Sequence, residues 1–196
     1  MTVSVETLLQ RIHELEDQLE TEFNERRAEF KYKIKKRRVI FEEDVARHHH
    51  ELKTHFWTYI HEARLMVLLT APFIYAVIIP FVLLDIFVSV YQAVCFPVYD
   101  IKKVRRSDFI VFDRHQLGYL NGIEKFNCLY CAYGNGLVAF VREVASRTEQ
   151  YWCPIKHAKK VIGTHVHYHG FTEYGDAVAY HTELEKIRKK LVELDE

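Results

Sequence analysis

The sequence carries no net charge, because 27 basic residues balance 27 acidic ones among its 196 positions. This balance excludes a molecule that is drawn as a whole to nucleic acid or to anionic lipid, so any electrostatic steering has to come from local patches. The first residues also lack a basic stretch leading into a short apolar core, and we therefore expect no cleavable signal peptide. The length suits one ordinary domain, or a membrane anchor between two small hydrophilic parts.

Proline and glycine are absent from Val5 to His61, which predicts one long helix over residues 1–61. Apolar residues recur on it at four-three-four spacing, as in a coiled coil: Leu8, Ile12, Leu15 and Leu19. The apolar stripe fades after Leu19, and two heptads alone make only a marginal coiled coil. We therefore expect this helix to pair with another chain or with the C-terminal segment.

One long apolar run, from Leu65 to Tyr99, occupies the middle of the chain. Its 35 residues contain only Asp85 and Gln92 as strongly polar interruptions, whereas one helical pass through a bilayer needs about 20 apolar residues. The run predicts a membrane anchor over residues 62–100. Its prolines kink or break a helix, which leaves two geometries: one long kinked transmembrane span, or a hairpin of two short helices.

Flanking charge favours the hairpin. A basic cluster follows the apolar run directly: Lys102, Lys103, Arg105 and Arg106. By the positive-inside bias, the part of the chain after the run should be cytoplasmic, and the part before it is rich in Lys and Arg as well. Both hydrophilic parts on the cytoplasmic side of a bacterial inner membrane require a hairpin.

Residues 101–196 predict a cytoplasmic helical segment, which completes an all-α fold. Asp113 can cap a helix that runs to about Cys131, and the Tyr-Gly-Asn-Gly sequence at 133–136 indicates a break. A second helix follows as far as about Trp152, so that the two form an antiparallel hairpin. A terminal helix is expected over 176–194.

Three of the four cysteines lie in this segment, within Cys128-Leu-Tyr-Cys131 and Cys153-Pro-Ile-Lys-His157. Thiolates and imidazoles bind zinc, mononuclear iron and iron–sulfur clusters, so these residues form a candidate metal site, with His115 brought near by the helical hairpin. An unbroken second helix would hold Cys131 and Cys153 roughly 22 Å apart, and one site then needs a break in that helix or a second chain. A redox-active Cys-x-x-Cys pair and buried structural cysteines are the alternatives.

Two further groups of residues are candidates for chemistry. The predicted hairpin sets six polar side chains opposite one another, as an acid–base network or as an ion-pair network that fixes helix register: Asn121, Glu124, Asn127, Arg142, Glu143 and Arg147. No Glu-x-x-His pair accompanies them, so we expect no di-iron carboxylate site. His165, His167 and His169 alternate, which we interpret first as a solvated loop and second as a metal-binding face.

Two further charged features are a basic cluster before the apolar run and one acidic residue within it. A second basic cluster precedes the apolar run: Lys31, Lys33, Lys35, Lys36, Arg37 and Arg38. We interpret it as a solvated face balanced by nearby acidic residues, and we expect no nucleic-acid partner. Asp85 is an ionisable group within an apolar stretch, and we expect it to be functional or paired.

Several motifs occur together in residues 70–180. They include Cys95-Phe-Pro-Val-Tyr99, Asn127-Cys-Leu-Tyr-Cys131 and Arg147-Thr-Glu-Gln-Tyr-Trp-Cys-Pro-Ile-Lys-His-Ala158. In these motifs the sequence resembles a group of small uncharacterised bacterial membrane proteins. The resemblance carries over no activity, cofactor or catalytic residue.

Three functions fit these observations. A membrane-anchored metal-binding or electron-transfer module, holding zinc, iron or an iron–sulfur cluster, is favoured by the Cys and His set. A non-catalytic scaffold or assembly factor is favoured by the long helix and by the lack of a nucleophile-and-base signature. A membrane enzyme acting on a lipid or a quinone is supported by Asp85 and the charged network. The expected partners are the lipid bilayer and either further copies of the chain or a membrane protein complex.

Overall fold

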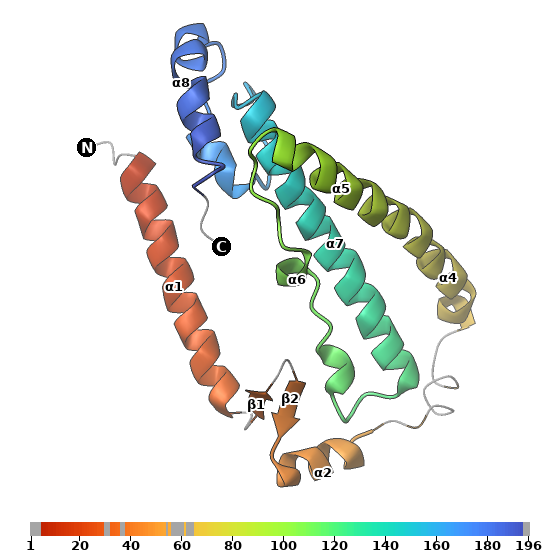
Figure 1. Ribbon diagram of the computed structural model, residues 1–196. Coiled ribbons are helices and arrows are strands. Elements are labelled where there is room, and N and C mark those ends of the chain that lie inside the picture. The colour runs from red at the N-terminus through yellow and green to blue at the C-terminus, as the bar shows by residue number, and fades with distance from the viewer. Residues whose placement is uncertain are drawn as a thin grey trace. The chain divides into compact units, whose positions relative to one another are not determined.

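The computed structural model describes residues 5–29, 32–35, 38–53, 55, 61 and 65–193. The protein is mostly helical, and the only β-strands among these residues form one two-stranded hairpin (Figure 1). The chain divides into two compact units. The first consists of Met1–Ile60 and Asp113–Lys125, and the second of His61–Phe112 and Phe126–Glu196. The prediction of a mainly helical protein is confirmed.

The first unit begins with helix α1 (Val5–Glu29), but the expected single helix over residues 1–61 is wrong. After α1 the chain forms strands β1 (Tyr32–Lys35) and β2 (Arg38–Phe41), followed by helix α2 (Glu43–Glu51). The strands are antiparallel, with Tyr32 opposite Phe41. The reason lies in the local sequence: apolar residues alternate with lysines in β1, and β2 contains the β-branched and aromatic run Val39-Ile-Phe41. Three residues of the basic cluster, Lys31, Lys36 and Arg37, lie outside the described residues.

A small aromatic cluster holds the rest of the first unit together. The ring of His49, on α2, lies 4.8 Å from the ring of Phe41 and 5.1 Å from that of Tyr119, both edge to face. The short helix η1 (Arg114–Gln116) contributes Gln116, whose Oε1 accepts a hydrogen bond of 2.7 Å from the Val39 N–H. These contacts tie the β-hairpin and α2 to the segment that leads into helix α7.

Helix α7 (Gly122–Trp152) begins at a capping box rather than at Asp113. The Glu124 N–H donates to Asn121 Oδ1 (3.0 Å), and the Asn121 N–H donates to Glu124 Oε2 (2.8 Å). This reciprocal pair satisfies two backbone donors that a helix start otherwise leaves open. The expected helix from Asp113 to Cys131 is therefore wrong in its start, and Asn121 and Glu124 act as a helix cap.

In the second unit, α4 (Leu65–Ala76) and α5 (Ile78–Val98) form one bent rod (Figure 1). Pro80 has no N–H to donate to the carbonyl one turn earlier, and the rod bends at Val77, just within that turn. The tight hairpin favoured by flanking charge is not what the structure has, since the chain continues in one direction. Over 34 residues the rod is about 51 Å long.

The C-terminal end of α5 turns the chain back sharply. Asp100 adopts a left-handed backbone conformation (φ 54°), and the Ile101 N–H donates to the Phe96 carbonyl at 2.9 Å. This is the pattern of a Schellman motif, and its apolar contact is present because Phe96 and Ile101 belong to the same buried cluster. The chain then runs back beside α7 as an irregular stretch, the return segment (residues 100–112), which includes the one-turn helix α6 (Arg106–Phe109).

Helix α7 continues without a break through Gly134 and Gly136, so the predicted turn at 133–136 and the antiparallel helical hairpin are wrong. The two glycines are contact points. A Cβ on Gly134 would lie 2.8 Å from the Phe81 ring, and one on Gly136 would lie 2.5 Å from the Phe109 carbonyl oxygen. Packing of the rod and of the return segment against α7 therefore overrides the local preference of glycine for turns.

Helices α5 and α7 run in the same direction, because Tyr75 of the rod contacts Asn127 while Tyr91 contacts Thr148. Beyond α7 lie helix η2 (Val166–Gly170) and helix α8 (Ala177–Lys189), which confirms the expected terminal helix apart from its last turn. The core of the unit is one cluster between these elements: Phe96, Ile101, Val104, Ile110, Leu137, Phe140, Val144 and Leu191.

Candidate functional site

The two polar residues of the apolar run both hold the return segment. Gln92 is buried, and its amide forms two hydrogen bonds with the backbone of Val104, accepting from the N–H (2.7 Å) and donating to the carbonyl (3.2 Å). Asp85 forms a two-bond ion pair with Arg106 and also accepts from the hydroxyl of Tyr133 (3.0 Å). The expectation that Asp85 is paired or functional is met by pairing, and both residues position the walls of the site described next.

An apolar groove of about 380 Å³ lies where α5 meets the C-terminal half of α7. Its lining side chains come from α5, from α7 and from the residue that follows α7: Val88, Tyr91, Val141, Val144, Ala145, Thr148, Glu149, Trp152 and Cys153. The Thr148 hydroxyl donates to the Val144 carbonyl (2.8 Å) and lies 3.0 Å from the Tyr91 hydroxyl, so the two hydroxyls satisfy each other. Apart from them, the groove has apolar walls and one charged group, the carboxylate of Glu149.

That carboxylate is held by an imidazole. Glu149 Oε2 lies 2.9 Å from His165 Nε2, and the side chains are 30% and 14% exposed. Among the described residues, Glu149 Oε1 has no hydrogen-bond partner, and neither has the buried Nδ1 of His165. The groove therefore contains an oriented carboxylate with one oxygen open to accept a further hydrogen bond.

A second carboxylate–imidazole pair lies next to the first, on the same two elements. Glu143 Oε1 lies 3.2 Å from His167 Nε2 and 2.8 Å from Arg147 Nε, and all three side chains are largely buried. The hydrogen bond from His167, with a further contribution from Arg147, lowers the pKa of Glu143 from 4.5 to about 2. Since the imidazoles of His165 and His167 are 6.0 Å apart, the two pairs together fasten the loop before η2 to α7.

The interpretation of residues 165–169 as a solvated loop is therefore wrong for two of the three histidines. His165 and His167 pack against α7, whereas His169 is exposed. The sequence signal available for this contact was weak, because it joins residues 16 and 24 positions apart with no local motif.

Two of the candidate metal ligands in the second unit, Cys131 and Cys153, are not close to each other. They are 22 residues apart along α7 and the residue that follows it, which corresponds to about 33 Å. His115 lies in η1 of the first unit, and the exposed His157 ring stacks on Tyr168. Among the described residues, no three His, Cys, Asp or Glu side chains are arranged to hold a metal ion. Zinc, iron or an iron–sulfur cluster bound between two chains stays a prediction.

The thiol of Cys153 has a raised pKa. Partial burial of the sulfur is the larger cause and the negative charge of Glu149 the smaller, although the residue as a whole is exposed. Thiol–disulfide exchange needs the thiolate, so a raised pKa slows that reaction at Cys153. Cys153 lies in the wall of the groove.

The remaining residues of the predicted polar network act separately. Asn127 Oδ1 accepts from the Tyr75 hydroxyl, which joins α7 to the rod. Arg142 donates to the Gly163 carbonyl (2.6 Å), and Arg147 also donates to the Lys102 carbonyl (2.7 Å). Glu143 and Arg147 do form an ion pair, but within one face of α7 rather than between two facing helices.

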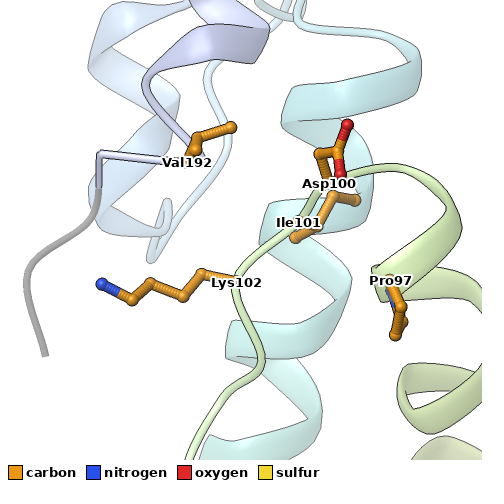
Figure 2. A pocket seen from close by; sticks show the side chains of 5 residues that line it. All are labelled: Pro97, Asp100, Ile101, Lys102 and Val192. Carbon is orange, nitrogen blue, oxygen red and sulfur yellow. The ribbon is translucent and has the colours of Figure 1, made fainter.

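A second hollow, also of about 380 Å³, lies at the C-terminal end of α5 (Figure 2). Its walls are Pro97, Asp100, Ile101, Lys102 and Val192. In Figure 2 the Lys102 side chain extends away from the carboxylate of Asp100, so the two charges do not converge on one point. We assign no ligand to this hollow.

Comparisons of this chain with models of known protein families, with curated proteins and with solved structures find no match. The fold by itself defines a mostly helical protein in which, among the described residues, one helix is long and apolar enough to cross a membrane.

Proposed function

We propose that this chain is a membrane-anchored protein that binds a single-chain amphiphile, with a hydrogen-bond-donating head group, in the groove between α5 and α7. The observation that carries the proposal is the combination of apolar groove walls with one open carboxylate oxygen at Glu149. The proposal is the binding part of the third function considered from sequence, a membrane protein that acts on a lipid or a quinone.

The membrane part of the proposal is supported by the surface of the rod. Large apolar side chains are exposed along its whole length, and in the most apolar window of the rod no residue is buried: Leu65, Met66, Val67, Leu68, Leu69, Phe73, Ile74, Val77, Ile79, Val82, Leu83, Leu84, Ile86, Phe87, Val90, Val94 and Val98. Water-exposed apolar surface of this extent is not expected of a soluble monomer. A bilayer with a hydrocarbon core of about 30 Å would cover it.

The groove itself has the properties of a lipid-binding site. Its volume is within the range of about 300–1,000 Å³ that is typical of small-molecule pockets. Val88 and Tyr91 belong to the rod, so the groove borders the apolar surface that the proposal places in lipid. An alkyl or isoprenoid chain can enter such a groove from the bilayer without crossing water.

Charge decides the class of head group. The open oxygen of Glu149 accepts hydrogen bonds and repels anions, so an alcohol, phenol or amine head group fits and a carboxylate or phosphate does not. The hydrogen bond with His165 holds the carboxylate in place. A donor head group would thus find its acceptor already oriented.

Quenching of Trp152 fluorescence by a bromine-labelled long-chain alcohol tests the proposal. Trp152 lines the groove, and in a Trp57→Phe background it is the only tryptophan of the chain. In the detergent-solubilised full chain, we expect saturable quenching. Ala145→Phe fills the groove and should weaken the apparent affinity by about tenfold or more, which corresponds to 1.4 kcal/mol.

The matched control is Ala139→Phe, which changes another exposed alanine of α7 outside the groove and should leave quenching unchanged. A bromine-labelled fatty acid should bind more weakly than the alcohol, and Glu149→Gln should remove that difference. Quenching that does not saturate, or that is the same in Ala145→Phe as in Ala139→Phe, contradicts the proposal.

The anchor is tested separately. We expect the full chain to stay in the membrane pellet after an alkaline carbonate wash, because the rod is too apolar to leave the bilayer. The proposal places Lys102 and its basic neighbours on the cytoplasmic side, and protease digestion of inverted vesicles should then cleave near them. Release of the intact chain by carbonate would refute the membrane anchor.

A further inference from the structure

Helix α1 presents an apolar stripe whose side chains are exposed in the described part of the chain. Five apolar side chains of the stripe are each between 44% and 56% exposed: Leu8, Ile12, Leu15, Leu19 and Phe23. Such values are those of side chains on the open face of a helix. Most of the stability of an amphipathic helix comes from packing of its apolar face, so this 25-residue helix is stabilised when a partner covers the stripe.

The spacing of the stripe specifies the partner's geometry. Leu8 and Leu15 fall at d positions of a heptad, and Ile12 falls at the a position between them. The next a position is Leu19, so the β-branched residue at a with leucine at d, which favours two parallel strands, occurs at Ile12. The apolar core of such a pair ends at Glu22, the next d position.

The charges that flank the stripe fit a second copy of the same helix. In the heptad, Arg11 is at a g position and Glu16 at the e position five residues later. In a parallel in-register pair, the g side chain of one helix lies beside the e side chain of the other. Arg11 of each copy therefore meets Glu16 of the other, and the two-fold symmetry forms this ion pair twice.

We infer that the occupant of the α1 stripe is the α1 helix of a second copy of this chain, in a parallel and in-register two-stranded coiled coil. The inference is independent of the amphiphile groove, since it uses only residues of α1. The short apolar core makes the dimer weak in solution, so its population depends on protein concentration.

Cysteine cross-linking tests the register. We expect Leu8→Cys and Leu15→Cys each to yield a disulfide-linked dimer of the full chain under mild oxidation, above the background of the parent chain with its native cysteines. The control is Asp17→Cys, which lies at the outward-facing f position and should stay at background. Efficient linking through only one of the two leucine positions would indicate antiparallel pairing and would overturn the inference.

Reversing the charges at Arg11 and Glu16 tests whether the partner is a second copy of α1. Light scattering of the detergent-solubilised full chain over a range of concentrations should show dimer formation, weakened about tenfold by Arg11→Glu because two like-charged pairs replace two opposite ones. Adding Glu16→Arg to that variant restores the pairs and should restore the dimer.

A further pair of variants tests whether the dimer contact lies on α1 or on another exposed apolar surface. Leu15→Glu should leave only monomer, whereas Val178→Glu, at an exposed apolar site of α8, should not change the mass. A chain that is monomeric at every concentration, or a dimer that survives Leu15→Glu, would refute the inference.

Discussion

Replacing Gly136 by alanine should destabilise the protein, because α7 meets the return segment at this glycine. The added Cβ would lie 2.5 Å from the Phe109 carbonyl oxygen and 2.9 Å from Ile110 Cα. Both atoms belong to backbone, so no side-chain rotation can relieve the contact. The return segment would have to move away from α7, and it is held there from the other side by Gln92.

The size of the effect follows from two opposing terms. Overpacking a tight contact costs about 1–3 kcal/mol, and a contact with backbone at this distance belongs at the upper end. Alanine is also a better helix former than glycine by about 1 kcal/mol in a helix interior. The net loss should be about 2 kcal/mol, which corresponds to a fall in Tm of roughly 4–8 °C for a chain of this size.

Thermal unfolding of the detergent-solubilised chain, followed by circular dichroism, measures this loss. Gly122→Ala is the control, since a Cβ there meets nothing within 4 Å. Gly134→Ala should have a smaller effect than Gly136→Ala, because its Cβ would touch the edge of the Phe81 ring, which can turn. Equal melting temperatures for Gly136→Ala and Gly122→Ala would refute the argument.

Gln92→Leu should lower the free energy of unfolding by about 3 kcal/mol in the same melting experiment, because it leaves the buried N–H and carbonyl of Val104 without partners, and an unchanged Tm would contradict this. Glu143 should contribute about 3 kcal/mol of stability above pH 4.5, since the imidazole and guanidinium bonded to it lower its pKa from 4.5 to about 2. This contribution is lost as the pH falls from about 4.5 towards 2, and Glu143→Gln should therefore flatten acid unfolding over that interval; the same pH profile in both proteins would count against it. Cys153 should be alkylated more slowly at pH 8 than a free thiol, because burial and the charge of Glu149 raise its pKa, and Glu149→Gln should speed the reaction as followed by peptide mass spectrometry. No change in rate in that variant would exclude the electrostatic part of the shift.

Much of the helical content could be predicted from sequence, because it depends on local composition. The apolar run becomes a helix from Leu65 to Val98, as its length and hydropathy predict, and α1 carries the predicted stripe. The start of α7 was also readable, since Asn121 and Glu124 have the spacing of a capping box. Strand β1 follows a two-residue alternation and β2 a β-branched and aromatic run, but the lack of proline and glycine favoured the prediction of a helix.

The candidate site was harder to predict from sequence, because its residues are far apart in the chain. Glu149 and His165 were each visible, but nothing local indicated that they would pair. The predicted metal site stays a prediction, and no group of three possible ligands is arranged for it among the described residues. Within one chain it needed a break in the helix between Cys131 and Cys153, and α7 runs unbroken from Cys131 to Trp152.

The sequence by itself determined where the apolar rod lies, that the chain is mostly helical, and that α1 carries an apolar stripe. These properties depend on hydropathy and periodicity within one element. Only the tertiary structure decided that Gly134 and Gly136 are packing contacts within a helix, and that Asp85 and Gln92 hold the return segment. The physical reason is that a glycine or a buried polar group has no fixed local outcome. Its role depends on which atoms the rest of the chain brings within a few ångströms.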